Sequence, residues 1–215
     1  MSNAVRKRLP AAQRRDVIER AATEVFAERG YRGAAIDEIA RRAGVSAPVL
    51  YDHFASKQDL HRRLLERTRD ELLEMWREHL FGDEPLEIRF PRAIDAWARY
   101  VEQHPYAARM FFRETTGEPE VEAFHAEIRD QARVALGAIA GQLEGAEQVA
   151  GGSSEELQMT SEIFRSGLTG LAVWWTDHPE ISREQIVSAA MNLFWVGFDR
   201  ARRGETWEGA AHADQ

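Results

Sequence analysis

Side chains that could bind phosphate gather in one short part of this sequence, between residues 36 and 60. Arginine, lysine, histidine, serine and tyrosine can each donate hydrogen bonds to a phosphate oxygen, and the cationic ones also bring charge. In this stretch they are Arg41, Arg42, Ser46, Tyr51, His53 and Lys57. No catalytic constellation is visible among them, so we expect binding to a polyanion here.

Catalytic and metal-binding patterns are absent from the sequence. The chain has no cysteine, and its seven histidines are scattered without the spacing of a metal-binding pair. It contains no G-x-S-x-G, P-loop or G-x-G-x-x-G pattern, and GLTGLA at residues 167–172 has the wrong spacing. The sequence therefore predicts that the protein is not an enzyme and holds no metal and no cofactor.

Charge is distributed unevenly along the chain, whose net charge is −8. Residues 1–70 hold 15 Lys and Arg against 10 Asp and Glu, which gives +5 there and −13 on the rest. A basic first third on an acidic body suggests that this end faces a polyanion. The basic start leads into no apolar segment, and no run is long and apolar enough to span a membrane. We therefore expect a cytoplasmic protein with no membrane partner.

The elements that must position the phosphate-binding side chains are short helices. Apolar residues recur at helical spacing over residues 13–30, 36–43 and 47–54. Gly44 suits a tight turn, Pro48 falls in a first helical turn, and Ser56 begins a long helix that reaches Leu80. Two short helices across such a turn form a helix-turn-helix, whose second helix can enter the major groove of DNA.

The rest of the chain is predicted to be a second helical region. Its helices are expected over residues 86–103, 105–116, 118–146, 153–177 and 183–203, separated by prolines, glycines and capping residues. The predicted parts are a basic arm (1–10), a helix-turn-helix domain (11–56), a connecting helix (57–81), a ligand-binding and dimerisation domain (82–204) and a disordered tail (205–215). The predicted fold class is therefore all-α.

Residues 26–60, FAERGYRGAAIDEIARRAGVSAPVLYDHFASKQDL, resemble the N-terminal domain of TetR-family transcriptional regulators. Order and spacing agree over about residues 13–65. The resemblance implies a three-helix DNA-binding domain and a helical domain that binds a small ligand and forms a homodimer. It also implies phosphate contacts from Tyr51, His53 and Lys57, base contacts from the helix at 46–53, and repression more often than activation.

The residues and the resemblance together predict which side chains contact DNA. Ala47, Pro48 and Val49 would meet thymine methyl groups, while Arg41 or Arg42 would supply a polar base contact. The full predicted set is Arg6, Lys7, Arg8, Arg41, Arg42, Ser46, Ala47, Pro48, Val49, Tyr51, His53 and Lys57. The expected partner is double-stranded DNA with a palindromic operator.

Two helical segments near the C-terminus are apolar around most of their circumference. Such helices are buried on more than one side, so one side can face its own domain and the other a second subunit. A fully internal helix pair is the alternative. The predicted homodimer interface, a two-fold four-helix arrangement, consists of Leu168, Leu171, Trp175, Ala190, Phe194, Gly197 and Phe198.

Large apolar side chains in the middle helices exceed what two facing layers need. Core packing is their more common role, but an apolar pocket between the helices is plausible. The candidate lining residues are Trp97, Tyr100, Met110, Phe111, Phe124, Ile128, Phe164 and Trp174. Polar groups that could orient a ligand are Arg99, His104, Arg109, Arg113 and His125. We expect a lipophilic effector, aromatic or acyl in character.

We interpret the chain as a homodimeric transcriptional regulator that a small effector releases from its operator. Effector entry would favour an arrangement in which the two reading heads no longer match half-sites about one helical turn apart. The long helix from Ser56 to Leu80 joins head and body and is the expected lever. The alternative is a dimeric helical module that binds proteins and has lost DNA binding, and salt-dependent DNA affinity would separate the two.

Overall fold

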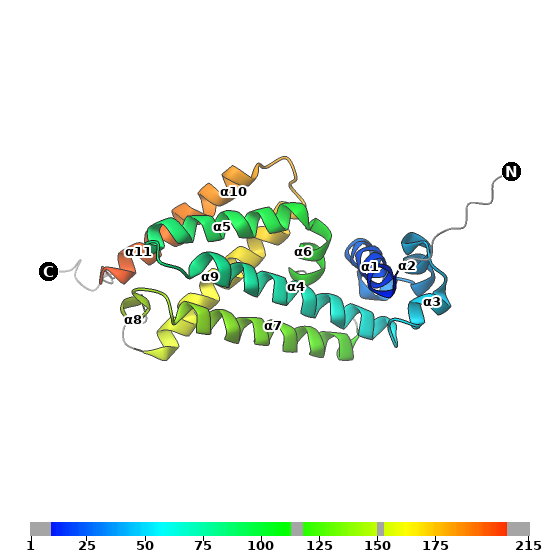
Figure 1. Cartoon of the computed structure of the whole chain (residues 1–215). Helices are drawn as coiled ribbons and strands as arrows, with labels where there is room; N and C mark the ends of the chain where they lie inside the picture. Colours follow the sequence, from blue (N-terminus) through cyan, green and yellow to red (C-terminus); the bar gives the residue numbers. More distant parts are fainter. Residues whose placement is uncertain (1–9, 113–117, 150–152, 206–215) are drawn as a thin grey trace.

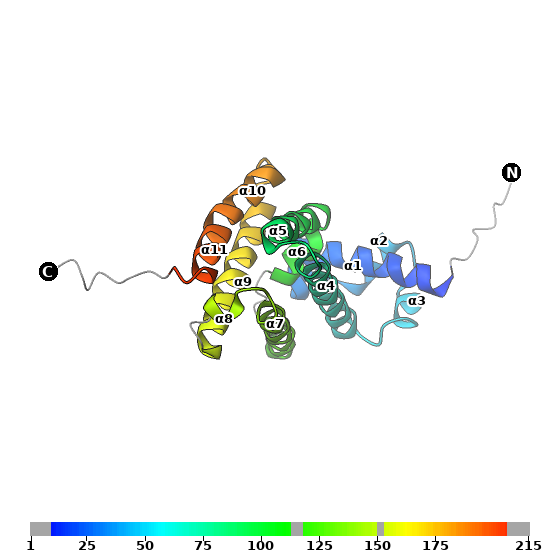
Figure 2. The same cartoon turned by 60° about the vertical axis from the view of Figure 1, so that its left-hand side comes forward.

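The computed structural model describes residues 10–112, 118–149 and 153–205 (Figure 1). Within these ranges the chain forms helices and turns and no strand, which confirms the all-α prediction. A small head lies at one end of the molecule and the C-terminal helices lie at the other (Figures 1 and 2). Arg6, Lys7, Arg8, Arg113 and residues 206–215 lie outside the described ranges. In the described part, no helix combines the length and the hydropathy that crossing a membrane requires.

The head consists of α1 (Ala11–Gly33), α2 (Ile36–Ala43) and α3 (Ala47–Tyr51). Gly30 has a φ of 68°, so the regular part of α1 ends there, as the sequence predicts. Gly44 is also left-handed, with a φ of 67°, and its N–H donates to the carbonyl of Arg41 at 3.2 Å. This closes the turn between α2 and α3. Because the chain turns after Tyr51, α3 is shorter than the helix predicted over 47–54.

The helix α4 (Lys57–Leu80) runs from the head into the body (Figure 1). Ser56 caps it, since its hydroxyl accepts a hydrogen bond from the N–H of Asp59 at 3.0 Å. Leu60 near its start is buried against the head, and Trp76 near its end is buried in the body. One continuous helix therefore connects both cores.

The body is built around α4 from longer and shorter helices. They are α5 (Leu86–Gln103), α6 (Pro105–Phe112), α7 (Pro119–Ala140), α8 (Ala146–Val149), α9 (Ser154–Thr176), α10 (Arg183–Ala190) and α11 (Val196–Arg202). α5 and α7 pack on α4, α9 packs on α6 and α7, and α10 covers α5. Trp97 of α5 is almost fully buried, which places the centre of this core between the long helices.

Two predicted helices differ from the structure. The helix expected over 118–146 ends at Ala140, and Gly145 then has a φ of 83°, which a right-handed helix cannot accommodate. The helix expected over 183–203 contains a π-helical segment, Met191–Trp195, between α10 and α11. Hydrophobic periodicity does not reveal such a segment, because it adds a residue to a turn without interrupting the helix.

Two buried histidines lie where the head meets the body. His61 of α4 and His125 of α7 are 1% and 2% exposed, and their ring centroids are 5.0 Å apart. The rings of Phe26, Tyr31 and Phe124 surround His61, with centroid distances of 4.5, 5.1 and 5.7 Å. His61 Nδ1 and His125 Nε2 have no hydrogen-bond partner within the described residues. Burial lowers the pKa of His61 to about 3 and that of His125 to about 4, so both rings are neutral.

Candidate functional site

α3 lies at the far end of the head (Figure 1). Several polar side chains around it are exposed. The Tyr51 side chain is 52% exposed, and Ser46 at the start of the helix exposes a hydroxyl that makes no capping hydrogen bond. Pro48 is also exposed, whereas Ala47 and Val49 are half-buried. The hydroxyl and phenol groups are therefore available to an external acceptor.

The two arginines of α2 have different surroundings. The Arg41 side chain is 74% exposed, and its ion pair with Glu38 is 3.8 Å long. Arg42 donates to Glu28 and Glu38 and lies 3.7 Å from Glu24, so it ties α2 to α1. Its hydrogen bond to Glu28 lowers the pKa of that carboxyl. The Arg41 side chain therefore points to solvent, whereas Arg42 is bound by acidic side chains of the head.

The segment between α3 and α4 is anchored from inside the head. Lys57 Nζ lies 4.4 Å from the centroid of the Tyr31 ring, and partial burial lowers the pKa of this ammonium. Arg15 Nη2 donates to the carbonyl of His53 at 3.2 Å, and its guanidinium carbon lies 5.4 Å from the Phe54 ring centroid. The sequence analysis missed Arg15, because no local pattern links residues 38 positions apart.

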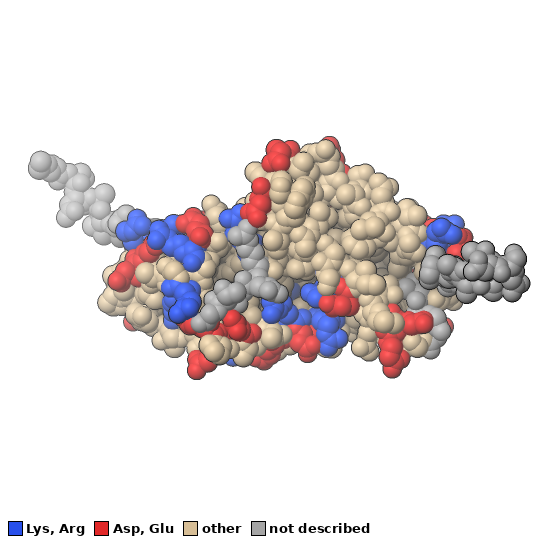
Figure 3. Space-filling model, turned by 180° about the vertical axis from the view of Figure 1, so that it is seen from behind, with Lys and Arg blue, Asp and Glu red and all other residues tan. Residues whose placement is uncertain are grey.

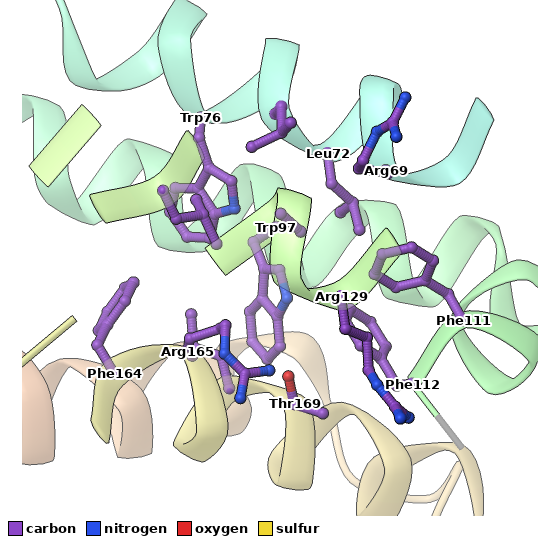
Figure 4. A pocket seen from close by; sticks show the side chains of 14 residues that line it. Arg69, Leu72, Trp76, Trp97, Phe111, Phe112, Arg129, Phe164, Arg165 and Thr169 are labelled. Atoms are coloured by element: carbon purple, nitrogen blue, oxygen red, sulfur yellow. The ribbon is translucent and has the colours of Figure 1, made fainter. Parts of the chain in front are cut away.

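An apolar cavity of about 70 Å³ lies between α4, α5, α6, α7 and α9 (Figure 4). Its apolar wall includes Leu72, Trp76, Trp97, Phe111, Phe164 and Leu168. Its polar lining consists of Arg69, Arg129, Arg165 and Thr169 (Figure 4). The cavity thus combines an aromatic interior with cationic side chains, which the sequence analysis did not assign to a pocket.

The three arginines of this cavity differ in their pairing. Arg69 lies 2.7 Å from Asp70, and Arg165 donates to Glu162 at 2.9 Å. Arg129 makes no ion pair or hydrogen bond within the described part of the chain. Its guanidinium therefore has no counter-charge in contact with it among residues 10–112, 118–149 and 153–205.

A second cavity, of about 270 Å³, lies between α4, α5, α7, α8, α9, the π-helical segment and α11. Its wall is mainly apolar and includes Leu80, Phe90, Ile139, Leu157, Phe194 and Phe198. Thr160 and Ser161 supply hydroxyl groups, and Ser161 Oγ is buried without a hydrogen-bond partner in the described residues. No charged side chain lines this cavity within the described part of the chain.

The predicted pocket residues divide into two groups. Trp97, Phe111 and Phe164 line the first cavity, and Phe164 lines both. The other five line neither cavity. The hydroxyl of Tyr100 donates to Glu71 at 2.9 Å, and Trp174 is exposed and stacked on His178. The remaining three are buried in the core: Met110, Phe124 and Ile128.

The predicted orienting groups also lie elsewhere. Arg99 forms an ion pair with Asp95 at 2.7 Å, and Arg109 forms one with Asp177 at 3.0 Å. His104 is exposed beside Tyr100, whereas His125 lies at the head–body junction. In the described ranges, no group of three or more His, Asp or Glu side chains is placed to hold a metal ion.

The back of the body has a broad area without charged side chains (Figure 3). α9 and the C-terminal helices lie on this side (Figures 1 and 2). They expose Ile163, Trp174, Leu193 and Val196, of which Ile163 is 68% and Leu193 is 71% exposed. Exposed apolar patches of this kind mark association surfaces.

Most of the predicted interface residues lie on the side of their helices that faces the subunit's own core. Leu168, Trp175 and Ala190 are buried in the subunit's own core, and Leu171, Phe194 and Phe198 are half-buried against it. Of the predicted set, only Gly197 is exposed. The apolar stripe chosen from the sequence is the inward one, and the opposite stripe, which carries Ile163 and Trp174, faces outward.

The sequence of the head matches that of a known protein family. Residues 18–64, which run from α1 into α4, match the model of the bacterial regulatory proteins of the tetR family. This part of the chain is a DNA-binding domain of the TetR type. The chain is 41% identical to the HTH-type transcriptional activator FasR of Mycolicibacterium smegmatis over 117 residues. The match covers 54% of this chain and 53% of FasR, so it spans about half the length of that relative.

Solved TetR-like structures match nearly the whole chain. A TetR-like regulator from Rhodococcus sp. RHA1 has a TM-score of 0.73 and 21% identity, covering 89% of this chain and 99% of that chain. The regulator FadR from Bacillus subtilis, solved in complex with stearoyl-CoA, has a TM-score of 0.68 and 17% identity, covering 88% and 98%. At these identities the likeness shows the fold: a helix-turn-helix head on a helical body.

Proposed function

We propose that this protein is a TetR-family DNA-binding transcriptional regulator that acts as a homodimer and responds to a lipophilic small molecule. The observation that carries the proposal is the helix-turn-helix of the head, which exposes Ser46, Tyr51 and Arg41 at the end of the molecule. The charge of +5 on residues 1–70 favours phosphate contact. Arg41 is the proposed polar base contact, because Arg42 is held by Glu24, Glu28 and Glu38.

The uncharged back of the body supports the homodimer. Ile163 of α9 and Leu193 of the π-helical segment both line the second cavity and are both exposed at the surface. A two-fold axis through this face would bury them and pair the two heads. Two identical heads would then read a palindromic operator with half-sites about one helical turn apart.

The cavities support a response to a ligand. Leu72 and Trp76 of α4 line the first cavity, while Leu60 and Leu64 of the same helix are buried against the head. A ligand in the cavity would therefore contact the helix that carries the head. The ligand would shift the equilibrium between two arrangements of the head if it binds the protein more tightly in one arrangement than in the other. The stearoyl-CoA complex of FadR supports an acyl effector for this fold.

The proposed sign of regulation is repression, with the effector releasing the dimer from its operator. FasR is named as an activator, so the sign needs its own test. In transcription with purified RNA polymerase from the bound promoter, repression predicts less transcript when the protein is added. An increase would show activation instead.

Selection of genomic DNA fragments by the purified protein tests the proposal as a whole. At about 0.15 M salt, we expect enrichment of a palindromic sequence, with affinity that falls steeply as salt rises. If a folded, dimeric protein enriches no sequence with or without candidate effectors, the alternative of a protein-binding module is favoured.

Tyr51→Phe should weaken operator binding about 10-fold, because a hydrogen bond to a charged phosphate is lost while the ring remains. Electrophoretic or fluorescence titrations on the selected operator would measure the loss. The preferred sequence should not change, since phosphate contacts carry no base information. Tyr106→Phe on α6, where the side chain is 42% exposed, is the matched control and should bind normally. Unchanged affinity in Tyr51→Phe would remove this residue from the contact set.

A further inference from the structure

The two cavities share three wall residues, and each comes from a different helix. Trp76 of α4, Leu136 of α7 and Phe164 of α9 line both spaces. The ring centroids of Trp76 and Phe164 are 5.8 Å apart, with the rings edge to face. These three side chains therefore form a partition between neighbouring cavities.

The order of the lining residues places the cavities end to end. On α4 the lining runs from Arg69 to Leu80, on α7 from Arg129 to Ala140, and on α9 in reverse from Thr169 to Leu157. In each helix the shared residue lies between the residues that line the first cavity and those that line the second. Eleven to twelve residues of α-helix span about 17 Å, so the two cavities together follow the bundle over about that length.

The two ends of this path differ in charge. Arg69, Arg129 and Arg165 all line the first cavity, and the second is lined by apolar and hydroxyl groups. Arg129 has no partner in the described residues, although a guanidinium near an apolar interior is stabilised by an anion. An elongated apolar path whose cationic side chains all line one of its two cavities fits a molecule that is anionic at one end and apolar along the rest.

The first cavity is small for a compact ring system, although the second is not. A cavity of about 150 Å³ binds benzene, whereas the first cavity measures about 70 Å³ and the second about 270 Å³. A thin chain could pass the first cavity once the side chains of the partition rotate. An extended alkyl chain advances about 1.3 Å per bond, given C–C bonds of about 1.5 Å, so a path of about 17 Å accommodates about 13 carbons.

We propose that the two cavities form one binding site for a single-chain amphiphile with an anionic head and a tail of about 12 to 14 carbons. Arg129, with Arg165 beside it, binds the head, and the tail displaces the Trp76–Leu136–Phe164 partition and fills the second cavity. The combined length of the two cavities thereby sets the longest chain that is bound tightly. The inference rests on the proposed effector response and names the ligand class for it. Free long-chain carboxylates and acyl thioesters of coenzyme A share this chemistry.

Calorimetric titration of the full-length protein with alkyl carboxylates of increasing length, below their micellar concentrations, tests the inference. We expect affinity to rise about fourfold per added methylene and to level off once the chain spans both cavities. Alcohols of equal length should bind at least 10-fold more weakly, because they lack the charge. Coenzyme A thioesters are the second series: tighter binding than the free acid identifies a thioester ligand, and weaker binding identifies the acid. An affinity that does not depend on chain length in either series overturns the proposal.

Arg129→Gln should weaken carboxylate binding about 10-fold and leave alcohol binding unchanged, so the preference for the anion is lost. Arg133→Gln is the matched control, because Arg133 lies one turn further along α7 and pairs with Asp130 at 2.7 Å. If Arg129→Gln keeps the full preference for carboxylates, Arg129 does not bind the head group.

Ala140→Phe tests the second cavity separately, since Ala140 lines only that space. The longest tightly bound chain should become several carbons shorter, whereas Ala138→Phe, at an exposed position of α7, should leave the length profile unchanged. An unchanged profile in a folded Ala140→Phe protein contradicts the end-to-end arrangement. Operator binding without ligand separates the two proposals: if DNA binds and no chain does, only the inference on the ligand fails.

Discussion

Leu193→Glu is expected to convert the dimer to a monomer and to abolish tight operator binding. Leu193 is 71% exposed on the C-terminal side of the body and, like the exposed Ile163, lines the second cavity. A carboxylate there costs little in the monomer, but in a dimer it would lose its water within an apolar interface. A cost of about 4 kcal/mol or more raises the dissociation constant of the dimer at least about 1000-fold. Because each head reads one half-site, the monomer also loses the combined affinity of two heads.

Sedimentation velocity over a range of concentrations measures the association, and fluorescence titration measures operator binding. Val134→Glu is the matched control, since Val134 is an exposed apolar residue of α7, 57% exposed, that lines neither cavity. It should remain dimeric. Circular dichroism must show that Leu193→Glu is folded. A folded Leu193→Glu protein that is still dimeric would show that the subunits associate through another face.

The helix-turn-helix could be predicted from sequence because its signals are local. Gly30 and Gly44 both adopt the left-handed backbone that their positions suggest, and Ser56 caps α4 through its own side chain. α2 begins and ends where the pattern predicts. These features depend on residues within one turn of each other, so no tertiary information is needed.

The side of α9 that faces outward could not be predicted, because this helix is apolar on two sides. Periodicity identifies stripes such as Leu168–Trp175 and Ile163–Trp174, but it does not say which one the subunit buries. The packing of α9 against α6 and α7 decides this, and those contacts are distant in sequence. A single strongly apolar stripe would have removed the ambiguity.

The cationic lining of the first cavity was missed for a related reason. In sequence, Arg129 and Arg165 are polar positions on long helices, where a solvated side chain is the usual outcome. The structure brings them to one cavity because α7 and α9 pack against each other. The pairing of His61 with His125 likewise depends on α4 lying against α7, across 64 residues of sequence.

This histidine pair should make the protein lose stability as the pH falls from about 7 to 4.5. Each imidazole has an ordinary pKa of about 6.5 in the unfolded chain, whereas burial lowers it to about 3 for His61 and about 4 for His125 in the folded protein. Between these values the unfolded chain binds more protons, so stability is complete above about pH 7 and is lost as the pH falls through 6.5. The expected loss is about 2 kcal/mol for each ring by pH 4.5.

Positive neighbours add to this effect and make the junction the sensitive point. Besides burial, Lys57 opposes protonation of His61, and Arg129 opposes protonation of His125. Urea unfolding at pH 7, 5.5 and 4.5 would measure how the free energy of unfolding changes with pH. His61→Phe should make this change smaller, because a phenyl group can pack against the neighbouring rings but does not titrate. His104→Gln, at an exposed position, should keep the wild-type slope. Equal slopes in His61→Phe and the wild type would mean that His61 is protonated in the folded protein, and that the junction opens to water before the chain unfolds.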